Sequence, residues 1–206
     1  SSTINGSGTL TVNASPSTTA IYSGRITGGA TIEKLGTGAF NLARLGTANA
    51  IGAINIHAGA LIGSQAGFGA ANLSVDNGAT IGFNNDDPTL AWTYAGQVTS
   101  TGVGTGTAGG TILKTGAGTL TFTADAKIDL VGNDPVLKLT ASNTGTNIFR
   151  ASLTDADIAA GNGIKTLTID GTGVWVLGGS ANRFKGDNID AAGKIFAKTG
   201  WTKREY

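Results

Sequence analysis

The residue types that most often carry out chemistry are scarce in this chain. It contains one histidine and no cysteine, whereas a zinc site or a nucleophilic triad needs several such groups together. The histidine, His57, lies two positions before a glycine, and Asp76 and Ala191 hold the same position in similar segments. Because this position accepts such different residues, we expect His57 to be a solvent-facing residue and not a catalytic group.

Acidic residues offer a second kind of chemistry. Glycoside hydrolysis needs two carboxylates that flank the scissile bond. The 13 acidic residues are scattered along the chain. The pairs that lie near each other are Asp86 with Asp87, Asp125 with Asp129, Asp155 with Asp157, and Asp187 with Asp190. Asp87 precedes a proline, which is typical of a turn. We therefore expect no catalytic residue and no enzymatic activity.

Metal, phosphate and membrane motifs are also weak. Calcium needs six or more oxygen ligands, and segment 186–190, Gly-Asp-Asn-Ile-Asp, is an isolated and imperfect copy of a calcium-binding repeat. A phosphate loop would continue with Gly-Lys-Ser/Thr after its glycines. The net charge of +1 provides no field for nucleic acid, and no apolar run approaches the ~20 residues that span a membrane. We expect no cofactor, no metal, no nucleic-acid partner and no membrane insertion.

The elements that must position any functional residue are short strands. A Gly-x-Gly segment occurs four times, each time with apolar residues two and four positions after the second glycine. The glycines are Gly6 and Gly8, Gly36 and Gly38, Gly116 and Gly118, and Gly171 and Gly173, and the apolar residues are Leu10 and Val12, Phe40 and Leu42, Leu120 and Phe122, and Trp175 and Leu177. This alternation predicts strands with one buried face, and the glycines predict a tight corner before each strand.

A period near twenty residues connects these strands. Gly38 and Gly59 are 21 positions apart, Gly59 and Gly78 are 19 apart, and Gly173 and Gly193 are 20 apart. A period of this length with glycine corners fits one turn of a β-solenoid. In such a fold parallel coils lie about 4.8 Å apart and pair through their backbones.

This period predicts the organisation of the whole chain. We predict an all-β solenoid of about ten coils over residues 1–197 and a charged C-terminal tail or cap over residues 198–206. One short helix is predicted over residues 152–160, as an insertion at a corner. Trp175 is predicted to lie in the core, and Trp92 and Tyr94 share one strand face that is either packed or exposed for contact.

Three segments are similar to a known repeat. Segment 34–42 reads Lys-Leu-Gly-Thr-Gly-Ala-Phe-Asn-Leu, segment 114–122 reads Lys-Thr-Gly-Ala-Gly-Thr-Leu-Thr-Phe, and segment 171–196 begins Gly-Thr-Gly-Val-Trp-Val-Leu. Together with similar flanking residues they cover roughly half of the chain and resemble the passenger-associated transport repeat of bacterial autotransporters. The resemblance implies a right-handed single-stranded parallel β-helix displayed at the cell surface, and it indicates no ligand. The translocator β-barrel of that family has no counterpart in this sequence, so we expect a released passenger, a fragment or a relative exported by another route.

The two ends of the predicted solenoid are its candidate assembly sites. A terminal coil exposes unpaired backbone N–H and C=O groups. We find no capping repeat before the first strand, so Ile4, Leu10 and Val12 are candidate contacts, and Trp201 and Tyr206 in the charged tail are candidates at the other end. Repeated contact between unlike ends builds an open filament.

These observations predict a non-enzymatic, extracellular or cell-surface bacterial protein. We expect a structural or adhesive β-helix rod that can polymerise end to end, as in a biofilm, with a host surface, a neighbouring cell or a glycan as a further partner. The chain opens at Ser1 and lacks methionine, which fits prior removal of a signal peptide. Two alternatives stay open: a β-helix carbohydrate-active enzyme (a polysaccharide lyase or hydrolase), and a passive spacer fragment of a larger autotransporter.

Overall fold

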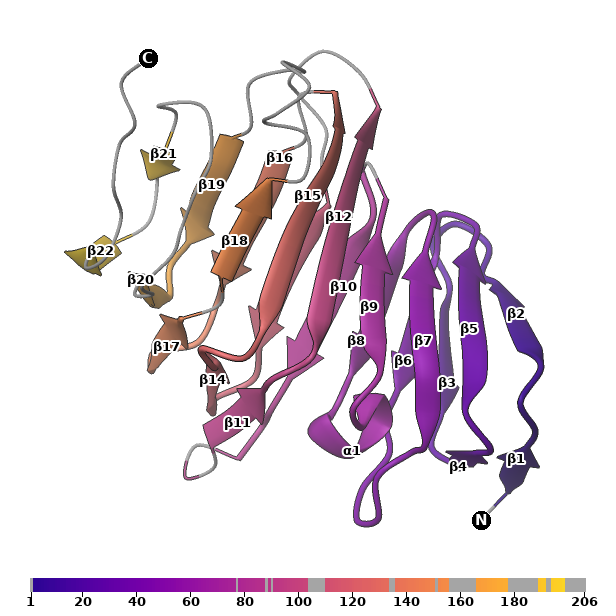
Figure 1. Ribbon diagram of the computed structural model, residues 1–206. Helices are drawn as coiled ribbons and strands as arrows, with labels where there is room; N and C mark the ends of the chain where they lie inside the picture. The colour runs from indigo at the N-terminus through magenta and orange to yellow at the C-terminus, as the bar shows by residue number, and fades with distance from the viewer. Residues whose placement is uncertain are drawn as a thin grey trace.

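The chain forms an all-β structure of parallel strands. The computed structural model describes residues 2–76, 78–87, 89, 91–103, 110–133, 136–150, 152–155, 166–177, 189–191 and 194–198. Every pair of neighbouring strands in these residues is parallel, and the helix α1 (Gln65–Phe68) is a single turn. The predicted all-β class and parallel pairing are confirmed. In Figure 1 the strands follow one another in layers, from β1 and β2 at one end to β20 and β22 at the other.

Three sheets contain nearly all of the described strands, and a short pair lies beside them. The first sheet consists of β2 (Thr9–Asn13), β5 (Ala30–Leu35), β7 (Ile51–Ile56), β9 (Asn72–Val75), β12 (Gln97–Val103), β15 (Lys127–Asn133) and β18 (Ser152–Asp155). The second consists of β3 (Thr19–Tyr22), β6 (Ala39–Leu42), β8 (Ala60–Gly63), β10 (Thr80–Asn84), β13 (Thr111–Thr115), β16 (Val136–Ala141), β19 (Thr166–Gly171) and β21 (Ile189–Ala191). The third consists of β11 (Ala91–Tyr94), β14 (Thr119–Phe122), β17 (Thr146–Phe149), β20 (Val174–Leu177) and β22 (Lys194–Lys198), and β1 (Thr3–Asn5) pairs with β4 (Arg25–Thr27).

The core runs along the stack because every second residue of a strand points inward. In the first sheet, Ile32, Ile54, Leu73 and Val98 share one register, and all four are buried. The second sheet has the same kind of ladder, formed by Phe40, Leu61, Ile81, Ile112, Leu139 and Ile169. Burial of successive apolar residues in register stabilises each coil against its neighbours.

The predicted corner glycines lie in the turns between consecutive strands. Gly36 has a φ of +72° and Gly116 a φ of +76°, a region that L side chains rarely adopt. Gly38 has no positive φ, but a Cβ atom there would lie 2.0 Å from the Ser15 carbonyl oxygen of the previous turn. The same kind of turn holds Gly118, Gly171 and Gly173, whereas Gly6 and Gly8, between β1 and β2, have open space around them. The corner therefore needs glycine for two different reasons, backbone conformation and close packing of turns.

The length of a turn is not constant along the chain. Phe40 pairs with Leu61, 21 positions later, which matches the predicted period. After β10 the turns are longer, since Ile81 pairs with Ile112, 31 positions later. The third sheet begins in the same region, at β11. The additional residues of the later turns therefore include the strands of the third sheet.

The helix α1 lies where this third face begins. In its own turn α1 follows β8, the position that β11 occupies after β10 in the next turn. Phe68 of α1 is fully buried, and its ring centroid lies 5.3 Å from that of Phe83 and 5.6 Å from that of Trp92. The Tyr94 hydroxyl donates a 2.7 Å hydrogen bond to the Ala71 carbonyl oxygen. Trp92 and Tyr94 are thus packed rather than exposed, and α1 covers the first strand of the third sheet.

Two other expectations can be compared with the structure. The predicted helix over residues 152–160 is wrong for its first part, because residues 152–155 form β18 and pair with β15. Backbone pairing with an adjacent strand outweighs the local helical preference of this segment. Residues 156–160 lie outside the described residues. The core position predicted for Trp175 is confirmed by its burial.

Candidate functional site

A ladder of three ionisable side chains lies on the outside of the first sheet. His57, directly after β7, is about half exposed, with 43% of its side chain accessible. Its Nε2 atom lies 2.6 Å from a Glu33 oxygen on β5, and its Nδ1 atom lies 2.7 Å from an Asp76 oxygen after β9. The solvent-facing position predicted for His57 agrees with this exposure. The two carboxylates are 24 and 19 positions away in sequence, so only the stacking of turns brings them together.

This ladder is arranged to hold a charged imidazolium. A neutral imidazole has one N–H group, whereas an imidazolium donates from both nitrogens. Hydrogen bonds to Glu33 and then Asp76 raise the pKa of His57 above its usual value, and they outweigh the opposing effect of burial. Both ring nitrogens are occupied by carboxylates, and the described residues hold no group of three or more His, Cys, Asp or Glu side chains suited to a metal ion. The ladder therefore links three successive turns through charge.

Two lysines lie inside the coil at the corners. Lys34 is fully buried, and its Nζ atom donates to the carbonyl oxygens of Leu35 (2.8 Å), Gly36 (2.7 Å) and Ala58 (3.0 Å). Burial lowers the pKa of this ammonium group. Because Ala58 belongs to the following turn, the ammonium group joins two turns at one corner.

Lys114 repeats this arrangement in a later turn. It is also fully buried, and it donates to the carbonyl oxygens of Thr115 and Gly116. Burial lowers the pKa of Lys114 to about 8, against an opposing effect of Asp86. Sequence reasoning assigned no role to either lysine. The available signal was that each stands two positions before a Gly-x-Gly and in the inward register of its strand.

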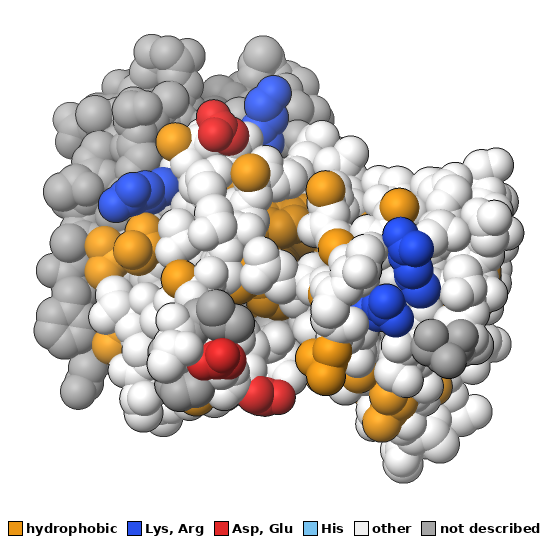
Figure 2. Space-filling model, turned by 90° about the horizontal axis from the view of Figure 1, so that it is seen from below, with side chains coloured by type: hydrophobic (Ala, Val, Ile, Leu, Met, Phe, Trp, Pro, Cys, Tyr) orange, Lys and Arg blue, Asp and Glu red, His pale blue; other side chains and the backbone are white. Residues whose placement is uncertain are grey.

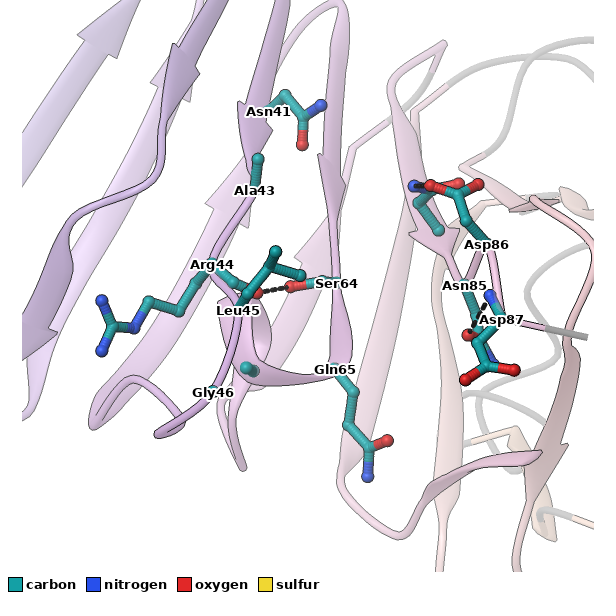
Figure 3. Close-up of a pocket in the computed structure, with 12 residues that line it drawn as sticks. Asn41, Ala43, Arg44, Leu45, Gly46, Ser64, Gln65, Asn85, Asp86 and Asp87 are labelled. Carbon is teal, nitrogen blue, oxygen red and sulfur yellow. Dashed lines mark hydrogen bonds between the residues drawn. The ribbon is translucent and has the colours of Figure 1, made fainter. Parts of the chain in front are cut away.

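A groove of about 670 Å³ opens where the coil widens. One wall is the segment 43–46 after β6, together with Ser64 and Gln65 at the start of α1, and the other is the segment 84–87 at the end of β10. Figure 3 shows Asn41 and Leu45 on the first side and Asn85, Asp86 and Asp87 across from them. In Figure 2 the surface is hollowed between the N-terminal turns on the right and the wider part of the molecule. The groove forms because two neighbouring turns differ in length. One turn ends in α1, whereas the next turn is longer and continues into β11.

Several backbone groups in the groove walls are already used in hydrogen bonds. The Leu42 carbonyl oxygen accepts from the Ser64 amide at 3.3 Å, and the Ser64 hydroxyl donates to the Arg44 carbonyl oxygen. On the other wall the Asn85 amide donates to the Thr115 carbonyl oxygen at 3.2 Å. At these positions a ligand would therefore be recognised through side chains.

Of the acidic pairs noted in the sequence, only Asp86 with Asp87 has both side chains described, and both line the groove. Asp86 accepts a hydrogen bond from Asn84, and Asp87 accepts from the amide and hydroxyl of Thr89, as expected for a turn. The second member of the pair Asp125 and Asp129 lies outside the described side chains, as do both remaining pairs, Asp155 with Asp157 and Asp187 with Asp190.

Among the described residues, no strand pairs with the outer edge of the first turn. β2 and β3 are the last strands of their sheets among the described residues. Ile4, Leu10, Val12 and Tyr22 pack against the core but are only partly buried. Their partners one turn later, such as Ile32 opposite Leu10 and Leu42 opposite Tyr22, are fully buried. The other two predicted contacts, Trp201 and Tyr206, lie outside the described residues.

These features define the chain as an all-β protein of parallel stacked strands with a ladder of ionisable side chains on its surface. No family model matches the sequence, and searches of curated proteins and of solved structures also found no match. Within the part of the chain that the structure describes, no helix is long and apolar enough to cross a membrane.

Proposed function

We propose that this chain is a structural and adhesive rod of the bacterial surface, a right-handed parallel β-helix that associates end to end. The half-covered first turn is the observation that carries the proposal. Inward-facing residues at this end are partly exposed, and the edges of β2 and β3 face no further strand within the described residues. A coil of the same kind would pair with both edges and bury the apolar residues.

The stacked architecture and the repeat resemblance support the same proposal. Parallel strand connections are right-handed in nearly all known cases, so we infer a right-handed coil. A uniform period predicts about ten coils. The turns after β10 are longer, so we infer fewer coils, close to eight, because each coil contributes one strand to the second sheet, which has eight strands. The similarity of three segments to the autotransporter passenger repeat supports display at the cell surface. A rod of this kind would act by presenting its sides and ends.

The end-to-end contact is tested with a charge at the open turn. Ala20 on β3 is exposed, although its partner one turn later, Phe40, is buried. Ala20→Lys should therefore fold normally but prevent another coil from covering this position, because a stacked coil would bury an unpaired ammonium group. Ala124→Lys, at an exposed turn between β14 and β15, is the matched control.

Multi-angle light scattering and negative-stain microscopy would measure the outcome. We expect the unmodified chain and Ala124→Lys to increase in mass with concentration and to form filaments, and Ala20→Lys to stay monomeric. A constant monomer mass for the unmodified chain at all concentrations would overturn end-to-end association, as would filaments of Ala20→Lys equal to those of the control.

A further inference from the structure

We propose that the groove between segments 43–46 and 84–87 binds a neutral or amino-substituted oligosaccharide. The proposal rests on the adhesive role proposed above and specifies the chemical class of the partner. The groove volume, about 670 Å³, falls within the range of small-molecule sites, about 300–1,000 Å³. It is an open groove on the outer surface and not an internal cavity (Figure 2). A short chain of sugar rings fits such a shape.

The polar groups in the groove match the hydroxyl groups of a sugar. The side-chain amides of Asn41 and Gln65 have no hydrogen-bond partner among the described residues, and an amide offers both donors and an acceptor. Asp86 is exposed, and only one of its carboxylate oxygens, Oδ2, accepts from Asn84. A carboxylate can accept several hydrogen bonds at once, so Asp86 can receive hydroxyl donors from a ligand.

The charges of the groove select against anionic ligands. Asp86 and Asp87 lie on one wall. The nearest cation on the opposite wall, Arg44, extends away from them in Figure 3, and its Nε atom donates to the Thr47 carbonyl oxygen at 3.0 Å. A uronate or a phosphate would meet the carboxylates of Asp86 and Asp87. The cation that interacts with Asp86, Lys114, is itself buried and donates to the Gly116 carbonyl oxygen, so it does not face the groove as a free charge. A neutral sugar avoids this repulsion, and an amino sugar gains a favourable charge contact.

The apolar part of the groove suits the C–H face of a sugar ring. Leu45 lines the groove and is 83% exposed. An aliphatic side chain next to amides and carboxylates provides a surface on which a ring can rest. Since no aromatic ring lines the described groove, we expect weak, millimolar binding, which many parallel contacts on a filament would strengthen.

The test is an NMR titration of the full chain labelled with ¹⁵N. The probes are chitotetraose, mannotetraose, the tetramer of glucosamine, and tetragalacturonate as the anionic comparison. We expect amide shifts confined to segments 41–46, 64–66 and 84–87 with at least one neutral or amino probe, and none with tetragalacturonate. Asp86→Asn keeps the shape of the side chain and should weaken binding roughly tenfold, and Leu45→Ser should weaken it about threefold. Asp125→Asn, an exposed carboxylate that does not line the groove, should bind normally.

Several results would overturn the proposal. These are the absence of groove shifts with every neutral and amino probe at millimolar concentration, equal binding of tetragalacturonate, or equal affinities of Asp86→Asn and Asp125→Asn. The titration and the light-scattering test are independent. Filaments without sugar binding would leave the rod proposal intact and remove the groove proposal, and sugar binding by a monomeric chain would do the reverse.

Discussion

At the scale of single residues, the chain uses its few charges to connect neighbouring turns. His57 is shared between carboxylates of the turns before and after it, and Lys34 joins carbonyl oxygens of two turns. In both arrangements each charged atom is occupied by partners from the fold itself. The scarce ionisable residues therefore contribute to the register and stability of the stack, and both contributions can be measured.

The ladder at His57 makes stability depend on pH. The pKa of His57 is raised in the folded state above its usual value of 6.5, so its stabilising contribution is complete below pH 6.5 and is lost as pH rises through the folded pKa. The contacts are half exposed, so we expect a contribution below about 1 kcal/mol. Urea unfolding of the unmodified chain and His57→Ala from pH 5 to pH 9 would measure it.

Two controls make this prediction specific. His57 is the only histidine, so its imidazole NMR signal reports its pKa directly, and that value should lie above 6.5. High salt should reduce the difference between the two proteins because it screens partly exposed charges. Parallel stability curves of the unmodified chain and His57→Ala across this pH range would contradict the prediction.

The buried lysine at the corner is expected to matter more. Lys34→Met preserves most of the side-chain volume but removes the ammonium donor from three carbonyl oxygens, of which only that of Leu35 keeps a second donor among the described residues, the Ala14 amide. Partly buried acceptors that lose their donor are costly, so we expect a loss of about 1–3 kcal/mol in the free energy of unfolding. Denaturant titration would measure this, with Lys127→Met, an exposed lysine on β15, as the control. The interpretation fails if both variants unfold at the same denaturant concentration.

At the scale of elements, the decisive feature is the change from shorter to longer turns after β10. The third sheet starts at β11, and the first strand of a sheet needs a cover for its open side. The helix α1 provides this cover through Phe68, whose ring contacts those of Phe83 and Trp92. The same step leaves the groove between segments 43–46 and 84–87. One local change in turn length thus produces both a packing requirement and a surface site.

The cover formed by α1 is tested by removing its buried ring. Phe68→Ala should lower the free energy of unfolding by about 3–5 kcal/mol, because it creates a cavity at the junction of two kinds of turn. Gln65→Ala, on the exposed side of the same helix, should change it by less than about 0.5 kcal/mol. Chemical unfolding would measure both variants, and a loss below about 1 kcal/mol for Phe68→Ala would show that α1 is not needed to cover the third sheet.

At the scale of the whole molecule, each turn contacts mainly the turns before and after it. Stability in such a stack is the sum of local terms and nearest-neighbour contacts. The first turn has a covered core on one side only, as the partial burial of Leu10 and Val12 shows. The turns around β8, β10 and β13 have neighbours on both sides and contain the aromatic cluster of Phe83, Trp92 and Phe122.

This difference predicts a gradient of hydrogen exchange along the stack. Amides of β10 and β13 should exchange slowest, and those of β2 and β3 should exchange faster by several orders of magnitude, because the first turn opens without breaking the rest. Native-state hydrogen exchange at low protein concentration would measure it. Association through the first turn should slow exchange in β2 and β3 at high concentration. Uniform protection across all of these strands at low concentration would contradict the expected gradient.

The sequence by itself determined the strands, their buried faces and many of the corners. Alternation of apolar residues, as at Phe40 and Leu42, and a glycine with positive φ, as at Gly36, are local properties that each segment expresses alone. They were sufficient to predict an all-β chain of parallel stacked strands. They were not sufficient over residues 152–155, where a locally helical pattern forms β18 because a neighbouring strand is available for pairing.

Only the tertiary structure decided which residues meet between turns. The partner of a residue in the next turn depends on the number of residues in that turn, and this number is 19 between Ile54 and Leu73 but 31 between Ile81 and Ile112. No local pattern reports that length. The contacts of His57, the bridging role of Lys34 and the groove beside α1 all depend on it. The fold could therefore be predicted from periodicity, whereas the candidate sites appeared only when the register of the stacked turns was known.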